Sequence, residues 1–196
     1  KTVPIVRVPW NDQVVIKRTL DVGAMGLVVP LVRTAQDVRD AISYSRYPPQ
    51  GIRGCAPRRA SDYGRHYKEY LQYANEAIIV IVQIEHIEAV RNLDEILAVP
   101  DLDGIFVGPA DLSNSMGFVG RPDAPEVQQV MDEVLQKAHR AGVYAGLATS
   151  GGVEDMGRWV ERGVQFLPVT GDRRLLSTAG SAILAGMRQW LETHGK

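Results

Sequence analysis

Two carboxylates follow two neighbouring hydrophobic runs of the chain. Glu85 closes the run 78–84 (IIVIVQI), and Asp111 follows the run 103–108 (DGIFVG) after a short turn. Both runs have the continuous apolar character of buried parallel strands. Because α/β proteins place their chemistry at the carboxyl ends of such strands, the two acids are expected to lie at one functional edge. Two carboxylates with no Cys or His motif beside them indicate a hard divalent cation.

Strand alternation adds two polar side chains to this edge. Gln83 lies two residues before Glu85 and therefore points to the same face of the strand, and Arg7 shares a face with Ile5 in the run 3–8. An arginine inside a strand is expensive to bury without a partner. Arg7 is therefore expected to face a carboxylate or an anionic ligand.

Simpler roles exist for the same residues. A glutamate at a strand end is favoured by the dipole of the helix that follows, and Asp111 could be an ordinary helix cap. If the turn at Gly108 opens a short helix, its N–H groups would form an anion site beside Asp111. The histidines are interpreted as ordinary surface or packing residues, and they are His66, His86, His139 and His194.

The elements that must position these residues alternate regularly between strand and helix. Strands are predicted at 3–8, 26–32, 78–84, 103–108, 143–148 and 165–170. Helices are predicted at 12–22, 34–46, 61–76, 86–98, 125–141, 152–162 and 174–193. This alternation predicts an α/β protein with a parallel sheet and helices outside it. Six such units fit either an open doubly wound sheet or a (β/α)8 barrel that lacks its first two units.

Composition excludes several classes of protein. The 196 residues carry a net charge of −1 and are 45% hydrophobic, which is enough for one domain with its own core and gives no reason to expect nucleic acid as a partner. The single Cys55 excludes an internal disulfide and predicts a cytoplasmic location. No apolar run is long enough to span a membrane, and neither a GxGxxG nor a P-loop motif for nucleotides is present.

Four strings together resemble a known family. VRVPWND (6–12), RYPPQGIRG (46–54), VQIEHIEAV (82–90) and DGIFVGPADLSNSMG (103–117) resemble, in order and spacing, the HpcH/HpaI aldolases, which are metal-dependent class II pyruvate aldolases. Members of that family cleave 4-hydroxy-2-oxoheptanedioate, 2-dehydro-3-deoxyglucarate or 2-keto-3-deoxy-L-rhamnonate. The resemblance implies a TIM barrel of the phosphoenolpyruvate/pyruvate type, with the first two βα units missing from this chain.

The resemblance also implies roles for the site residues. It makes Glu85 and Asp111 the ligands of Mg²⁺, Mn²⁺ or Co²⁺, and Arg7 the catalytic residue that contacts the pyruvate oxygen. It makes the following residues binders of the 2-oxo acid: Arg7, Gln83, Gly108, Ala110 and Asp111. The family's catalytic His belongs to an acidic motif that is expected upstream of Lys1. Arg33 departs from the family pattern, because many relatives have Gln there.

The implied activity is the reversible aldol cleavage of a 4-hydroxy-2-oxo acid to pyruvate and an aldehyde. Two alternatives remain open. One is another pyruvate-enolate condensation, like those of a citrate synthase or macrophomate synthase, and the other is a non-catalytic barrel that binds a metal and an oxo acid. Small molecules are the expected ligands, with neither nucleic acid nor membrane as a partner. Residues 1–196 are expected to form a single partial barrel domain of a homohexamer, a trimer of dimers, with the helix at 174–193 packing across subunits.

Overall fold

One parallel sheet organises the chain. The computed structural model describes residues 2–149 and 151–195. Its sheet follows the chain order β1-β2-β3-β4-β5, with every neighbouring pair parallel. In a doubly wound sheet the order reverses at a switch point, whereas a βα barrel adds each strand beside the last. The strand order is therefore that of a barrel. The strands are β1 (Ile5–Arg7), β2 (Gly26–Val29), β3 (Ile79–Ile84), β4 (Gly104–Val107) and β5 (Tyr144–Leu147).

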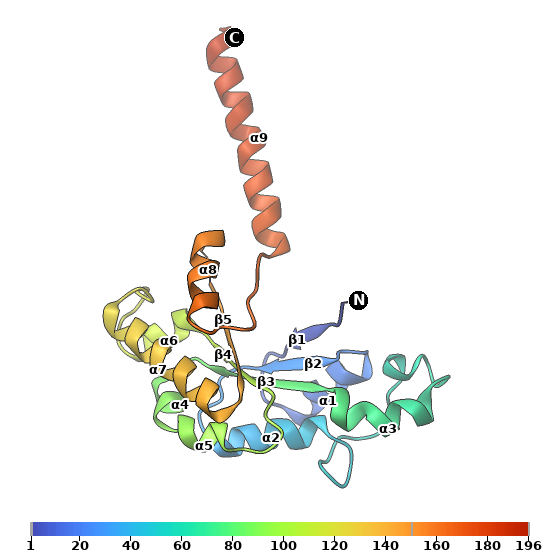
Figure 1. Cartoon of the computed structure of the whole chain (residues 1–196). Coiled ribbons are helices and arrows are strands. Elements are labelled where there is room, and N and C mark those ends of the chain that lie inside the picture. The colour runs from blue at the N-terminus through green and yellow to red at the C-terminus, as the bar shows by residue number, and fades with distance from the viewer. Residues whose placement is uncertain (1, 150, 196) are drawn as a thin grey trace.

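Helices connect the strands, and α1, α2, α5 and α7 cover one face of the sheet (Figure 1). A 3-10 turn, η1 (Arg59–Ser61), lies in the long excursion between α2 and α3. The helices are α1 (Gln13–Asp21), α2 (Ala35–Ser45), α3 (Tyr67–Ala77), α4 (Ile87–Arg91), α5 (Leu93–Leu97), α6 (Pro109–Ser115), α7 (Pro125–Ala141), α8 (Val153–Glu161) and α9 (Asp172–His194).

The two faces of the sheet have different neighbours. Val80, Val82 and Ile84 belong to the large core between the sheet and the helices. Ile81 lies between them in sequence and packs on the opposite face with Val28, in a smaller apolar cluster. This alternation follows from the two-residue period of a strand. The face of Ile81 corresponds to the interior of a barrel, and it is the face from which Gln83 and Glu85 project.

Caps and turns set the helix boundaries that the sequence indicated. The Asp12 carboxylate accepts hydrogen bonds from the N–H groups of Val14 and Val15 at the start of α1. Thr34 and Asp37 form a reciprocal capping box at the start of α2. Gly142 ends α7 with a φ of +71°, a conformation that costs glycine little. The helix predicted at 125–141 therefore has the observed bounds.

Several predicted elements differ from the observed ones. The helix expected at 61–76 begins only at Tyr67, and the strand expected at 26–32 ends at Val29. The sixth strand, expected at 165–170, reduces to a single parallel bridge between Gly146 and Phe166. Pro168 has no N–H with which to extend a strand ladder, which accounts for the short pairing. The helix expected at 86–98 is divided into α4 and α5 at Asn92, whose side chain turns back to the loop after β2.

The helix α9 stands away from the sheet (Figure 1). None of its 23 residues is buried. Its exposed apolar residues include Leu176, Ile183, Met187 and Trp190, whose spacing of seven, four and three residues forms one stripe. Within residues 2–149 and 151–195, no helix combines the length and apolar character needed to cross a bilayer.

Candidate active site

The carboxylate of Glu85 is the centre of the candidate site. Only 5% of Glu85 is exposed. Its Oε1 accepts a hydrogen bond of 2.8 Å from the backbone N–H of Leu31, and its Oε2 accepts one of 3.0 Å from Nε2 of Gln83. Each oxygen has a further lone pair available. The side chain is therefore fixed by two donors and still able to bind a cation.

Gly108 leaves the space that this carboxylate occupies. It follows β4, and its N–H donates to the carbonyl of Ile84, which brings the ends of β3 and β4 side by side. A β-carbon at Gly108 would lie 2.9 Å from Oε2 of Glu85 and 3.0 Å from the Cβ of Glu85. Any larger residue would displace the carboxylate, so glycine is required at this close approach.

Asp111 and Arg7 are close enough to change the ionisation of Glu85. Burial is the first cause of a raised pKa of Glu85, because it removes water from the charged form. The N–H of Leu31 opposes that rise, the negative charge of Asp111 adds to it, and the positive charge of Arg7 opposes it. The three charged residues that sequence reasoning selected therefore interact at one end of the sheet.

Each charged partner comes from a different element. Asp111 lies in the first turn of α6, where a carboxylate is favoured by the helix dipole. Arg7 ends β1 on the same face as Ile5, which packs with the inner cluster. The Arg7 side chain is exposed, so packing does not fix its position. It is available to an anion at the end of the sheet.

Gln83 has an unsatisfied oxygen in this site. The residue is 7% exposed, and its Nε2 is used by Glu85. Its Oε1 is buried and has no hydrogen-bond partner in the described part of the chain. Such an orphaned acceptor calls for a donor from a bound water or ligand.

The donors suit a hard divalent ion. Two carboxylates form an oxygen-only set, which Mg²⁺ and Mn²⁺ prefer. Among the described residues no cluster of three or more His, Cys, Asp or Glu could hold a metal. A metal at Glu85 and Asp111 would therefore take its remaining ligands from water and substrate, as Mg²⁺ commonly does.

A cavity of about 820 Å³ opens beside the α6 turn. Pro109 and Ala110 line one side of it, and Thr149, Asp155 and Trp159 line the side formed by the end of β5 and by α8. This volume is in the range of small-molecule sites. Of the site residues, Ala110 lines this cavity, whereas Glu85 and Asp111 are not among its lining residues. The cavity therefore lies next to the α6 turn and not around the carboxylates.

Sequence reasoning missed Leu31. Its backbone is in the left-handed region, with a φ of +57°. Leucine is not a residue that favours this conformation, so its type gave no indication of the turn. Pro30 was the one local sign, since proline often precedes a turn residue.

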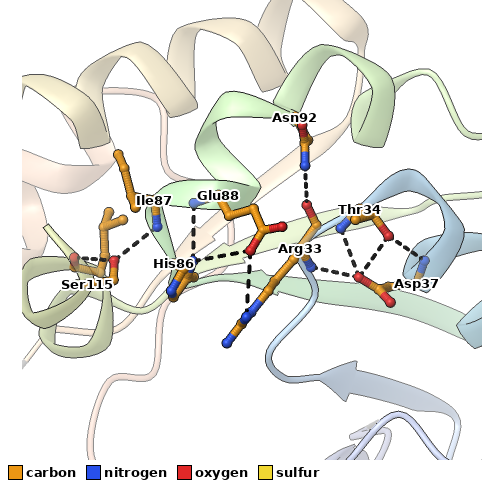
Figure 2. A network of polar contacts seen from close by, with 9 residues as sticks. Arg33, Thr34, Asp37, His86, Ile87, Glu88, Asn92 and Ser115 are labelled. Atoms are coloured by element: carbon orange, nitrogen blue, oxygen red, sulfur yellow. Dashed lines mark hydrogen bonds and ion pairs between the residues drawn. The ribbon is translucent and has the colours of Figure 1, made fainter.

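His86 does not join the site. Its Nδ1 accepts a hydrogen bond from the N–H of Glu88 and caps α4. Figure 2 shows His86 and Glu88 beside Arg33, whose guanidinium lies 3.6 Å from the Glu88 carboxylate. The cap is a structural role, in keeping with the interpretation of His86 from the sequence.

The polar contacts of Figure 2 join the loops after three strands. Asn92 donates through Nδ2 to the carbonyl of Arg33, which ties the loop after β2 to the α4–α5 junction. The N–H of Ile87 donates to the hydroxyl of Ser115, which ties the loop after β3 to α6. These two hydrogen bonds thereby hold together the segments that carry Leu31, Glu85 and Asp111.

Comparison with known proteins agrees with this arrangement. The family model for HpcH/HpaI aldolase/citrate lyase matches residues 1–179. A 4-hydroxy-2-oxo-heptane-1,7-dioate aldolase of Shigella sonnei (strain Ss046) is 44% identical over 185 residues, which are 93% of this chain and 70% of that protein. The chain is thus related over nearly its whole length to a named aldolase.

Solved structures give the same result. The crystal structure of an HpcH/HpaI aldolase/citrate lyase family protein from Burkholderia cenocepacia J2315 has a TM-score of 0.88 and 36% identity, over 94% of this chain and 73% of that one. The citrate synthase SbnG has a TM-score of 0.84 and 32% identity, over 97% of this chain and 74% of that one. The predicted α/β barrel fold and the resemblance carried by four sequence strings are confirmed. The chain belongs to the HpcH/HpaI aldolase/citrate lyase family.

Proposed function

We propose that this protein is a divalent-metal-dependent carbon–carbon lyase that cleaves a 4-hydroxy-2-oxo acid, of the 2-keto-3-deoxy sugar acid type, to pyruvate and an aldehyde. The observation that carries the proposal is the buried Glu85 carboxylate at the carboxyl end of the sheet, held by the N–H of Leu31 and by Gln83. The charges of Asp111 and Arg7 both influence its pKa. Two acids there provide a cation site, and the arginine provides a donor for an oxo acid beside it.

Retro-aldol cleavage leaves an electron pair on the carbon that becomes the methyl group of pyruvate. That pair must be delocalised onto the neighbouring keto oxygen as an enolate. A divalent ion held by Glu85 and Asp111, which we take to be Mg²⁺, Mn²⁺ or Co²⁺, would supply a Lewis acid beside that oxygen. Lysine is not needed for this chemistry, in contrast to enzymes that form a Schiff base.

Arg7 would stabilise the charge that develops on the enolate oxygen. A guanidinium presents several N–H donors in a fixed plane. Because the charge on that oxygen increases in the transition state, the interaction strengthens there and lowers the barrier.

The turn after β4 would hold the substrate carboxylate. The first N–H groups of a helix have no acceptor within the helix, and at the start of α6 these include the N–H groups of Ala110 and Asp111. Ala110 also lines the cavity. We assign the carboxylate to Gly108, Ala110 and Asp111, and assign to Gln83 the role of a hydrogen-bond partner within the site. The role of general base is not assigned to a residue of this chain.

One alternative function rests on a specific observation. The likeness to the citrate synthase SbnG favours a second candidate, in which the same enolate is used to form a carbon–carbon bond with another carbonyl compound. A barrel that binds the metal and the oxo acid without turnover is the third possibility. All three share the site at Glu85 and Asp111.

The test uses the purified protein with pyruvate in D₂O. Metal-dependent exchange of the pyruvate methyl protons is expected, with loss on chelation and in Glu85→Ala and Asp111→Ala. Folded wild-type protein that exchanges no protons in the presence of Mg²⁺, Mn²⁺ or Co²⁺ would leave only the binding role. Product identification with a panel of aldehydes and oxo acids then separates aldol cleavage from the citrate-synthase-like condensation.

Assembly is the last part of the proposal. The exposed apolar stripe of α9 has no partner among the described residues of its own chain, and an apolar stripe of this kind needs one. We infer that α9 packs on a second copy of the chain in a homo-oligomer, with a hexamer built as a trimer of dimers as the expected form.

A further inference from the structure

Leu31 has an unusual backbone for its residue type. It follows β2 with a φ of +57°, in the left-handed region where a side chain crowds the backbone. Its side chain is 39% exposed, so deep burial of the leucine does not compensate for this conformation. A left-handed residue other than glycine persists only where its surroundings fix it, and such residues gather at functional sites.

The effect of this conformation is to direct the Leu31 N–H at Glu85. The donor and acceptor are 54 residues apart in sequence, and the hydrogen bond between them is 2.8 Å long. A hydrogen bond to a charged carboxylate is stronger than one between neutral groups. The contact therefore links the loop after β2 directly to the end of β3.

The loop is fixed on the C-terminal side of this contact. The N–H groups of Arg33 and Thr34 both donate to the Asp37 carboxylate at the start of α2. The carbonyl of Arg33 accepts from Asn92, as Figure 2 shows. The backbone of Arg33, two residues beyond Leu31, is thus held through both its N–H and its carbonyl.

The carboxylate is confined from the opposite side as well. Gln83 donates to Oε2, and the α-carbon of Gly108 lies so close that a β-carbon there would be 2.9 Å from the same oxygen. Glutamate has three rotatable side-chain bonds, and restricting them before a ligand arrives removes an entropic cost from binding.

We propose that Leu31 is a positioning residue whose left-handed backbone presents its amide to Glu85 and thereby presets this carboxylate for a divalent ion. The inference rests on the proposed function, because it takes Glu85 to be a metal ligand. Partners that orient a metal ligand from outside commonly change metal affinity by about 10–100-fold when they are lost. Leu31 acts through its backbone, so its side chain is not required.

The first test compares two substitutions by titration with Mn²⁺ followed by electron paramagnetic resonance. Leu31→Val, whose branched side chain strongly disfavours a positive φ, is expected to weaken Mn²⁺ binding by about tenfold. Leu31→Gly, which adopts this backbone freely, is expected to stay within about threefold of the wild type. Asp101→Val is the matched control, because Asp101 has a φ of +63° in the α5–β4 turn, and its Mn²⁺ affinity should not change.

A second measurement requires no change at Leu31 and no metal. Hydrogen exchange of the Leu31 amide is followed in metal-free wild type and in metal-free Glu85→Ala. Removing the acceptor should accelerate exchange of this amide by about tenfold or more, while the amides of the β3 strand keep their protection. Equal rates in the two proteins would overturn the proposal, because the contact would not exist in solution.

The outcomes separate this proposal from the function on which it rests. Wild-type protein that binds Mn²⁺ and exchanges pyruvate protons, with unchanged Mn²⁺ affinity in folded Leu31→Val, overturns only the role of Leu31. Wild-type protein that binds no divalent ion overturns both. If Leu31→Val does not fold, a backbone ester at position 31 removes the N–H and keeps the side chain, and unchanged affinity there also overturns the proposal.

Discussion

Glu85 and Gly108 approach each other so closely across the ends of β3 and β4 that no side chain fits between them. A β-carbon at Gly108 would lie 2.9 Å from Oε2 of Glu85, closer than real β-carbons approach any atom. The nearest displaced atom would be the end of the glutamate side chain rather than backbone, and the β-carbon of Glu85, at 3.0 Å, would have to shift slightly. A larger residue at Gly108 would therefore disturb the site more than the fold.

Gly108→Ala is therefore expected to reduce divalent-ion affinity by about 10–100-fold, the range seen when groups around a metal ligand are changed. The carboxylate must rotate away from its two donors to make room for the methyl group. Calorimetric titration with Mn²⁺ measures the affinity, and thermal unfolding without metal measures stability. The control is Gly157→Ala on α8, because a β-carbon there meets no atom within 4 Å, and this variant should bind Mn²⁺ normally. Gly117→Ala is unsuitable as a control, since Gly117 has a φ of +87°.

The raised pKa of Glu85 predicts a pH-dependent stability of the metal-free protein. In the unfolded chain this carboxyl ionises near its ordinary pKa of about 4.3. Burial raises its pKa in the folded protein, so the folded state binds the proton more tightly. The ionised group consequently lowers the free energy of unfolding at neutral pH, and this loss develops as the pH rises from the unfolded pKa through the folded pKa.

Glu85→Gln removes that unfavourable charge. The metal-free variant is expected to melt above the wild type at pH 7, with the difference disappearing below about pH 4, where the carboxyl is protonated in both states. The new amide oxygen can still accept from Leu31, and its NH₂ can donate to Oε1 of Gln83 once that side chain rotates. Thermal melts in EDTA across this pH range measure the effect, and a variant that is less stable at every pH would contradict it.

Added metal should reverse the order of the two proteins. A divalent ion at 100 times its Kd stabilises a protein that binds it by about 2.7 kcal/mol, and a variant without the site gains nothing. Wild type with Mn²⁺ is therefore expected to melt above Glu85→Gln at pH 7. The same order with and without Mn²⁺ would argue against Glu85 as a ligand.

Arg7→Ala is expected to reduce turnover far more than metal affinity. Loss of one donor to a developing oxyanion typically costs about 10²–10³-fold in kcat. Arg7 is exposed, and its charge is the smallest of the influences on the pKa of Glu85. The Mn²⁺ affinity should therefore change little. Arg7→Lys keeps the charge without the planar set of donors and should recover part of the rate. A kcat equal to that of wild type in Arg7→Ala would remove Arg7 from the mechanism.

The stripe on α9 predicts a specific effect on assembly. Ile183 is 69% exposed at the middle of this stripe, and a carboxylate there would be buried without a partner in an oligomer. Ile183→Glu is expected to shift the protein to smaller species in analytical ultracentrifugation. Gln189→Glu adds the same charge on the opposite side of the helix and should leave the mass unchanged. Equal masses for wild type and both variants would exclude α9 from the interface.

The sequence by itself determined the features that depend on local geometry. The two-residue period of a strand placed Gln83 and Glu85 on the face of Ile81, and the helix periodicity and Gly142 defined α7. These features depend on bond geometry and on residue types within one element. The carboxylates Glu85 and Asp111 could be selected for the same reason, because each follows its own strand.

The tertiary structure decided the contacts between elements. Leu31 reaches Glu85 across 54 residues through a backbone conformation that its residue type disfavours, and Gly108 adjoins Glu85 only because β3 and β4 pair in one register. The position of α9 away from the sheet likewise depends on which surfaces pack together and not on the periodicity of its own sequence. A sequence specifies each strand and helix through neighbours along the chain, whereas register, loop closure and helix docking depend on the sum of many weak contacts between distant residues.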